Sequence, residues 1–199
     1  KDSAVLSCCL AENRFEILTE MSSELDRCQK SLSDYLETKR CAFPRFFFIS
    51  DDELLSILGT SDVTCVQEHM LKLFDNSAKL LFSRGNKIVK GLESSEGESF
   101  DFKTAVGTDG AVESWMTNIQ AEMRVSLRNI LKENVFLYPK QDRIPWLHAN
   151  LGMNAITGSQ IWWAWEVENS FAQVRKGNKY GVKDYAKVLH DQMNKLVTE

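Results

Sequence analysis

The residues that could perform nucleophilic chemistry are separated from one another along the sequence. A cysteine nucleophile needs a histidine base within hydrogen-bonding distance. The three histidines, His69, His148 and His190, each lie alone in a segment with helical periodicity. The G-x-S-x-G string of a serine nucleophile is absent from the sequence. The sequence therefore predicts no catalytic residue and places the histidines at surface or partly buried positions.

The cysteines give no sign of a disulfide framework or a redox motif. There are five, an odd number, with no C-x-x-C spacing: Cys8, Cys9, Cys28, Cys41 and Cys65. All lie in the first third of the chain, within segments that have helical periodicity. We therefore expect reduced, buried or half-buried thiols in a cytosolic protein.

Phosphate and metal sites are also not predicted. The G-x-x-x-x-G-K-[ST] loop that wraps phosphates is missing, and the segment between Gly91 and Gly97 carries acidic residues that would repel a phosphate. Residues 51–53 form an acidic cluster that a helix cap explains. The glutamates of residues 93–98 lie at a predicted turn, and neither group has calcium-loop spacing. We expect no cofactor and no metal in this chain.

The length and composition of the chain are sufficient for one hydrophobic core of ordinary size. Of 199 residues, 43% are hydrophobic and 26% are charged, which predicts a single segment. The net charge of −4 gives no electrostatic reason to expect nucleic acid as a partner. The longest apolar clusters, such as residues 46–49, are too short to span a membrane. No signal peptide is visible, and a first residue other than Met suggests a piece of a longer chain.

The first quarter of the sequence predicts one long helix from about Val5 to Lys39. A seam with alternating spacings of three and four residues predicts packing against neighbouring helices. Its members are Leu18, Met21, Leu25, Cys28, Leu32 and Tyr35. Pro44 is expected to stop the helix, and the apolar residues 45–49 are expected to be extended.

Two capping boxes are predicted after this segment. Residues 50–53 (SDDE) should begin a short helix that Gly59 ends. Residues 64–67 (TCVQ) repeat the spacing and should begin a second short helix. The side chains predicted to lie on the buried face of that helix are Val66, Met70, Leu73 and Phe74.

Residues 79–102 change from helical to β-compatible periodicity. Short apolar runs at residues 79–82, 87–92 and 100–102 are separated by turn signals at residues 83–86 and 94–97. This pattern predicts a hairpin or a three-stranded patch that packs against helices, because an isolated hairpin is only marginally stable in water. The predicted fold class is mostly α, an elongated helical bundle with one small antiparallel β-hairpin at about residues 79–102.

Helical periodicity returns near Ala111 and continues to about Asn134, then again from Gln160 to about Arg175, and a last amphipathic helix follows the loop of residues 176–181. Residues 145–158 contain Pro145, Gly152 and Gly158. These residues should interrupt or soften the helix there, which makes this stretch a candidate hinge.

Three tryptophans, Trp162, Trp163 and Trp165, fall within four residues of one predicted helix. Side chains at these positions point in different directions around a helical turn. We expect this helix to be packed in the core on more than one side. The alternative is that an exposed tryptophan docks another domain.

An ordered set of strings resembles the linker region, N-terminal region 2, of dynein heavy chains. The strings are residues 28–32 (CQKSL), 35–40 (YLETKR), 43–48 (FPRFFF), 52–59 (DELLSILG), 94–98 (SSEGE), 112–116 (VESWM), 160–163 (QIWW) and 166–168 (EVE). The resemblance covers nearly the whole chain from about residue 15. The sequences of residues 136–140 (FLYPK) and 160–163 resemble those of axonemal heavy chains, of the inner-arm type.

The resemblance implies a mechanical role rather than a catalytic one. In that family the linker lies across a ring of AAA+ modules and bends as the ring hydrolyses ATP, so ATP and Mg²⁺ would bind elsewhere in the heavy chain. The implied partners are the AAA+ ring, the rest of the heavy chain and, through the parent complex, intermediate and light chains and microtubules. The implied location is the cytoskeleton and the ciliary axoneme.

The residues alone are compatible with two other hypotheses about function. The first is a free-standing cytoplasmic helical scaffold or adaptor. The second is a thiol- or metal-dependent enzyme. We expect neither nucleic acid nor a membrane as a partner.

Overall fold

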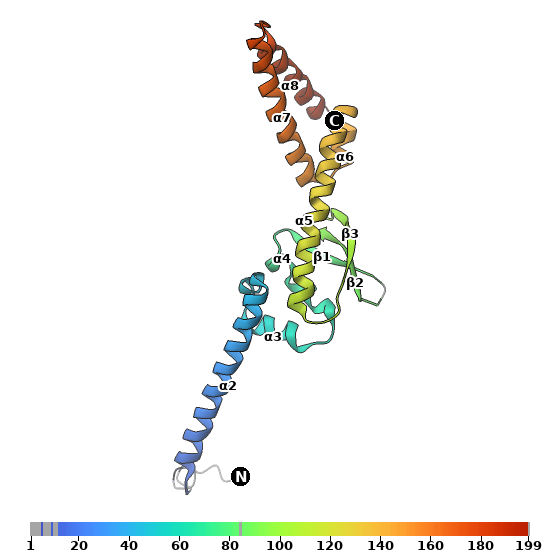
Figure 1. Cartoon of the computed structure of the whole chain (residues 1–199). Helices are drawn as coiled ribbons and strands as arrows, with labels where there is room; N and C mark the ends of the chain where they lie inside the picture. The colour runs from blue at the N-terminus through green and yellow to red at the C-terminus, as the bar shows by residue number, and fades with distance from the viewer. Residues whose placement is uncertain (1–4, 6–8, 10–11, 84, 199) are drawn as a thin grey trace. The chain divides into compact units, whose positions relative to one another are not determined.

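The computed structural model describes Val5, Cys9, residues 12–83 and residues 85–198 (Figure 1). The prediction for Cys8, part of the predicted first helix and one residue of the predicted turn at residues 83–86 lie outside the described residues. The chain divides into two compact units. The first contains Lys1–Asp75 and Asp109–Thr117, and the second contains Asn76–Thr108 and Asn118–Glu199.

The described residues are mostly helical. The α-helices are α2 (Arg14–Ala42), α3 (Asp51–Gly59), α4 (Met70–Leu73), α5 (Val112–Leu137), α6 (Arg143–His148), α7 (Gly152–Arg175) and α8 (Gly181–Val197). The 3₁₀ helices are η1 (Pro44–Phe48), η2 (Val63–His69) and η3 (Tyr138–Lys140). The strands are β1 (Ser77–Phe82), β2 (Ile88–Ser94) and β3 (Ser99–Gly107). The predicted fold class, mostly α with a small antiparallel sheet, is confirmed.

Helix α2 carries the predicted seam on its surface. The helix follows Asn13, which has a left-handed φ of 56°, and ends where Phe43 becomes extended before Pro44. The five large seam residues are 42–69% exposed: Leu18, Met21, Leu25, Leu32 and Tyr35. The predicted packing of this seam against other helices is therefore not formed among the described residues.

The prediction of an extended segment at residues 45–49 is wrong, because Pro44 opens the 3₁₀ helix η1. Proline suits a first helical position, since its φ is already helical and its missing N–H has no partner to lose there. Phe46 is fully buried, and its ring meets that of Phe43 edge to face at 4.9 Å between centroids. Burial of these rings in a tight turn explains why the apolar run is not a strand.

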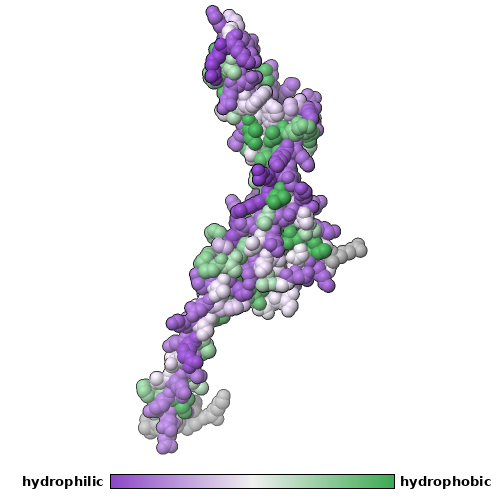
Figure 2. All heavy atoms as spheres, viewed as in Figure 1, coloured by the Kyte–Doolittle hydropathy of each residue, from purple (hydrophilic) through white to green (hydrophobic). Residues whose placement is uncertain are grey.

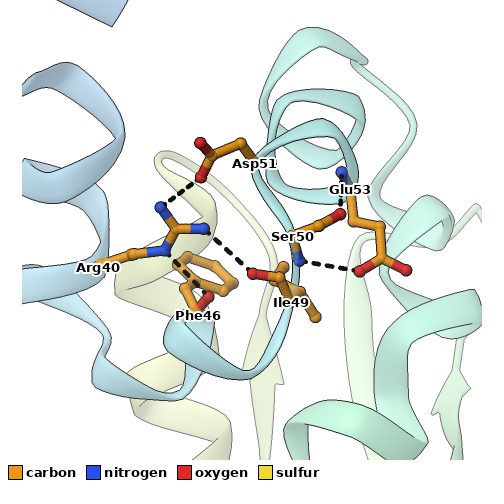
Figure 3. A network of polar contacts seen from close by, with 6 residues as sticks. All are labelled: Arg40, Phe46, Ile49, Ser50, Asp51 and Glu53. Carbon is orange, nitrogen blue, oxygen red and sulfur yellow. Dashed lines mark hydrogen bonds and ion pairs between the residues drawn. The ribbon is translucent and has the colours of Figure 1, made fainter. Parts of the chain in front are cut away.

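Arg40, near the end of α2, holds the connection from η1 to α3 (Figure 3). Its Nε donates to the Phe46 carbonyl at 3.3 Å and its Nη2 donates to the Ile49 carbonyl at 3.1 Å. Its Nη1 pairs with Asp51 Oδ1 at 2.7 Å. One planar guanidinium thus satisfies two backbone carbonyls and a carboxylate at the chain reversal.

Of the two predicted capping boxes, the first is confirmed and the second is wrong. Glu53 N–H donates to Ser50 Oγ at 3.3 Å, and Ser50 N–H donates back to Glu53 Oε2 at 3.0 Å. In the second segment Asp62, rather than Thr64, is the cap, and its Oδ1 accepts the Thr64 N–H at 2.9 Å. The helix there is first 3₁₀ and then α, yet the predicted buried side chains are all buried: Val66, Met70, Leu73 and Phe74.

The sheet is antiparallel with the order β1-β2-β3. It is longer than the predicted runs, and its buried face carries Leu80, Val89 and Leu92. The register shifts between Val89 and Gly91 on β2. A Cβ at Gly91 would lie 2.2 Å from the Phe100 carbonyl oxygen, so only glycine fits this close approach of two strands.

The structure also corrects the C-terminal half of the prediction. Helix α7 begins at Gly152 rather than Gln160 and continues without a break through Gly158. The predicted softening at Gly158 is therefore wrong, and the hinge at residues 145–158 stays a prediction. Helices α5 and α8 match the predicted segments.

Glu53 supplies a prediction about acid stability. The bond from the Lys72 ammonium, and then the Ser50 N–H, lower the pKa of Glu53 from 4.5 to about 2. A carboxyl with a depressed pKa stabilises the fold above its unfolded pKa and loses this effect as pH falls through the folded pKa. The natural chain should have a higher unfolding free energy than Glu53→Gln. This difference should be largest above pH about 4.5 and should shrink as pH falls toward about 2. Urea unfolding across this range measures it.

The matched control is Glu24→Gln, at an exposed position of α2. Its difference from the natural chain should change little over the same range. A Glu53→Gln difference that stays constant with pH would contradict the assignment.

Candidate functional site

Aromatic side chains of the second unit meet where α5 ends and α6 and α7 begin. We call the ring cluster there the aromatic junction, defined by Tyr138, Trp146, Trp162 and Trp165. Tyr138 stacks on Trp162 at 5.3 Å with an interplanar angle of 10°, and meets Trp146 edge to face at 5.0 Å. Trp165 meets Trp162 edge to face at 5.3 Å. These ring contacts join η3, which carries Tyr138, to α6 and α7.

Two indole groups of this junction bind the C-terminal end of α5. Trp146 Nε1 donates to the Asn134 carbonyl at 3.0 Å, and Trp162 Nε1 donates to the Val135 carbonyl at 2.8 Å. Carbonyls in the last turn of a helix lack amide partners from their own helix. For Val135 the residue four positions on is Pro139, which has no N–H. The Trp162 indole supplies the donor that Pro139 cannot.

Arg143 of α6 joins the same junction to α7. Its guanidinium carbon lies 5.3 Å from the Tyr138 ring centroid and 4.8 Å from that of Trp146. Its Nη2 donates to Ser159 Oγ on α7 at 2.7 Å. The cation therefore contacts two rings and bonds a helix, which stabilises the arrangement of α6 against α7.

Close packing of α5 against α7 depends on Gly158. A Cβ at this position would lie 2.6 Å from Asn134 Oδ1 and 3.3 Å from Trp146 Cζ2. The Asn134 side chain is 1% exposed, and its Oδ1 and Nδ2 have no hydrogen-bond partner among the described residues. Gly158, which suggested a weak point in the sequence, is the residue that permits this contact.

The contact between α7 and α8 is polar at its centre. Tyr185 OH donates to Glu166 Oε2 at 2.8 Å. Burial, and then the bond to Glu166, raise the pKa of Tyr185. The phenol therefore stays protonated and acts as a hydrogen-bond donor rather than a base. A slot of about 280 Å³ beside this pair is lined by Tyr138, Arg143 and Gln192, among others.

The predicted core packing of the tryptophan-bearing helix holds for one of its three tryptophans. Trp162 is half-buried, whereas Trp163 is 52% exposed and Trp165 is 56% exposed. Figure 2 shows apolar surface at the level where Figure 1 draws α6 and the first turns of α7. Exposed Met153 and Ile156 belong to this stretch of α7. The exposure agrees with the alternative, an exposed tryptophan that docks another domain, and the docking itself stays a prediction.

The structure describes four of the five cysteines. Among these four, Cys9, Cys28 and Cys41 are exposed, so the prediction of buried or half-buried thiols is correct only for Cys65. Burial, and then the charge of Asp62, raise the pKa of the Cys65 thiol, which disfavours the reactive thiolate.

His69 lies with its Nδ1 3.6 Å from Glu53 Oε1, in the capping network of α3. His148 and His190 are exposed on α6 and α8. The histidines therefore occupy the surface or partly buried positions that the sequence predicts.

The acidic residues have structural roles. Asp51 pairs with Arg40, and Glu93 pairs with Lys79 at 2.7 Å. Within residues 12–83 and 85–198, with Val5 and Cys9, no group of three or more histidine, cysteine or acidic side chains could hold a metal ion. Across the same part of the chain, no helix combines the length and apolarity that crossing a membrane needs.

One contact between distant segments was not predicted from the sequence. Glu98 lies at the predicted turn, and its Oε1 accepts the N–H of Gly152, 54 residues later, at 2.9 Å. The only sequence signal near it was the S-x-E-G-E string of residues 94–98. No local pattern indicates which distant helix such a carboxylate meets.

The family model for the dynein heavy chain, N-terminal region 2, matches residues 1–134. The chain belongs to the dynein heavy chain family. The predicted resemblance is thereby confirmed, and the matched residues include α2, the sheet and most of α5.

The relatives are axonemal. The chain is 57% identical over its whole length to the Dynein-1-alpha heavy chain, flagellar inner arm I1 complex, of Chlamydomonas reinhardtii, and 48% identical to Dynein axonemal heavy chain 10 of Homo sapiens. Over 92% of its length it is 40% identical to the ciliary Dynein beta chain of Heliocidaris crassispina. It spans about 4% of the length of each of these relatives. The axonemal type and the location in the ciliary cytoskeleton are confirmed.

The indole cap generates a prediction for Trp162→Phe. Phenylalanine keeps a ring against Tyr138 but leaves the Val135 carbonyl without its donor. Loss of a bond to a part-buried carbonyl costs about 1–3 kcal/mol, so the unfolding free energy should fall by that amount in chemical denaturation. Trp163→Phe is the matched control, because the exposed neighbour should change stability by less than about 0.5 kcal/mol. Equal effects of the two substitutions would contradict the cap.

Gly158→Ala tests the close contact by the sign of its effect. Helix propensity alone predicts that alanine stabilises a helix interior by about 1 kcal/mol. The short distance to Asn134 instead predicts destabilisation by about 1–3 kcal/mol through overpacking. Gly59→Ala is the control, since a Cβ there meets nothing within 4 Å. Thermal unfolding that shows Gly158→Ala to be stabilising would overturn the packing argument.

Proposed function

We propose that this chain is a non-catalytic mechanical segment of the linker of an axonemal dynein heavy chain. In this role it transmits ATP-driven changes of the AAA+ ring as a power stroke for microtubule-based ciliary motility. The observation that carries the proposal is the joining of α5 to α7 by side-chain bonds at the helix ends. Trp162 and Trp146 bond the C-terminal end of α5, and Gly158 allows α7 to pack closely against it. A displacement of α5 is therefore passed to α7.

The chemistry of the parent motor is assigned to other parts of the heavy chain. ATP and Mg²⁺ would bind in the AAA+ modules, and this segment would hold no cofactor. The described side chains support this assignment, because Tyr185 and Cys65 are both held in their protonated forms. Neither serves as a base or a nucleophile in that form.

The proposed partners are the AAA+ ring and the remainder of the same heavy chain. The exposed seam of α2 and the exposed tryptophans of α7 support this, because a helix face rich in large apolar side chains marks an interaction surface. Intermediate chains, light chains and microtubules would be reached through the parent complex. By likeness to the flagellar inner-arm relative, the parent is proposed to be an inner-arm dynein.

The free-standing scaffold is the alternative, and the comparisons favour the segment instead. The likeness runs along the whole chain but covers only about 4% of each relative. That pattern is expected for a piece of a very long chain.

The test inserts four Gly-Ser residues after Asn150, between α6 and α7, in the full-length heavy chain of the assembled dynein. A mechanical segment predicts microtubule gliding reduced by about half or more with ATP hydrolysis retained, because a flexible insert transmits less displacement. The same insert after Gly85, in the β1–β2 turn, is the control and should leave gliding near its natural velocity. Unchanged gliding with the insert after Asn150, or ATP hydrolysis lost in proportion to gliding, would overturn the proposal.

A further inference from the structure

The backbone of the turn between β2 and β3, residues 94–98, is held by several hydrogen bonds. Ser94 N–H donates to the Glu98 carbonyl at 2.8 Å, and Ser94 Oγ accepts the N–H of Glu96 and of Glu98 at 3.3 and 3.1 Å. Gly97 has a φ of +87°, a conformation that favours glycine. These bonds fix the position from which the Glu98 side chain leaves the sheet.

Helix α7 lacks a cap from its own sequence. Leu151 precedes it and offers no side-chain acceptor, and its first turn has no acidic residue. The Glu98 carboxylate instead accepts the Gly152 N–H at 2.9 Å. A carboxylate at this end of a helix satisfies a free amide and interacts favourably with the helix dipole. A Cβ at Gly152 would lie 3.3 Å from the same oxygen, so the small residue admits the carboxylate closely.

The sheet is bonded to α5 at a second place. Lys103 N–H of β3 donates to Ser126 Oγ at 2.8 Å, and Thr104 N–H donates to Glu122 Oε1 at 2.9 Å. Ser126 Oγ also donates to Glu122 Oε1 at 2.9 Å, and Ser126 is 2% exposed. The sheet therefore bonds α5 through β3 and α7 through Glu98.

We propose that the β2–β3 turn is a brace across the aromatic junction, with Glu98 as the positioning residue that sets the start of α7. The three contacts close a triangle: α5 to the sheet, the sheet to α7, and α7 back to α5 through Trp162. A triangle resists bending at the junction more than the direct contacts between α5 and α7 alone, because the sheet adds a second connection between these helices. The brace gives the SSEGE string a mechanical role, and its part in motility rests on the proposed function above.

The brace is tested in the full-length heavy chain of the assembled dynein with Glu98→Ala. The matched control is Glu96→Ala, which removes an exposed carboxylate from the same turn. Hydrogen exchange of peptides covering the first turn of α7 should be about three- to tenfold faster in Glu98→Ala than in the natural protein. Glu96→Ala should exchange at the natural rate, and Glu98→Gln, which keeps a carbonyl acceptor, should restore most of the protection.

Peptides from α2 report whether the substitution acts locally, because α2 lies in the other unit. Their exchange should be unchanged in every variant. Equal exchange of α7 in Glu98→Ala and Glu96→Ala overturns the brace, as does faster exchange throughout the chain.

Gliding velocity and ATP hydrolysis of the same variants separate the brace from the proposed function. Slower gliding with ATP hydrolysis retained in Glu98→Ala, together with the faster exchange, supports the brace as part of the lever. Faster exchange with unchanged gliding supports the structural brace and overturns its mechanical role. The insertion after Asn150 tests the lever with the Glu98 side chain left in place.

Discussion

The donation of the Trp162 indole N–H to the Val135 carbonyl is the interaction on which the second unit depends. Pro139 removes the amide that would otherwise bond this carbonyl, so α5 must end within a turn or receive a donor from elsewhere. The donor comes from α7, and this places the Trp162 ring against Tyr138. Trp146 also donates to the preceding carbonyl, that of Asn134. The end of one helix thereby determines where the next two lie.

Side chains from other elements also bond backbone groups at the ends of η1 and α7. Arg40 donates to the carbonyls of Phe46 and Ile49 at the end of η1. Glu98 accepts the free amide at the beginning of α7. Glu98 satisfies an amide that α7 leaves free, whereas Arg40 adds a second donor to the Phe46 carbonyl, which also accepts the Ile49 N–H. Because these groups cost free energy when left unpaired, such bonds hold successive helices in a defined arrangement.

This construction is compatible with the proposed mechanical role, in which the segment moves as a body. The titratable groups with shifted pKa values serve the fold: Glu53 caps α3, Lys39 pairs with Glu113, and Tyr185 donates to Glu166. Perturbed groups often mark active sites, but ion pairs and caps perturb pKa values as well. The large apolar side chains left exposed on α2 and α7 are what a segment of a much longer chain would present to its neighbours.

Local signals in the sequence determined the elements: helical periodicity for α2, α5 and α8, turn residues for the three strands, and the capping box at Ser50. The ordered strings determined the family. Tertiary structure decided what depends on distant partners: the 3₁₀ turn at Pro44, the continuation of α7 through Gly158, the exposure of Trp163 and the meeting of Glu98 with Gly152. The physical reason is range. Propensity and capping act within about one turn of helix, whereas a glycine is favourable or costly according to which side chain packs against it from elsewhere.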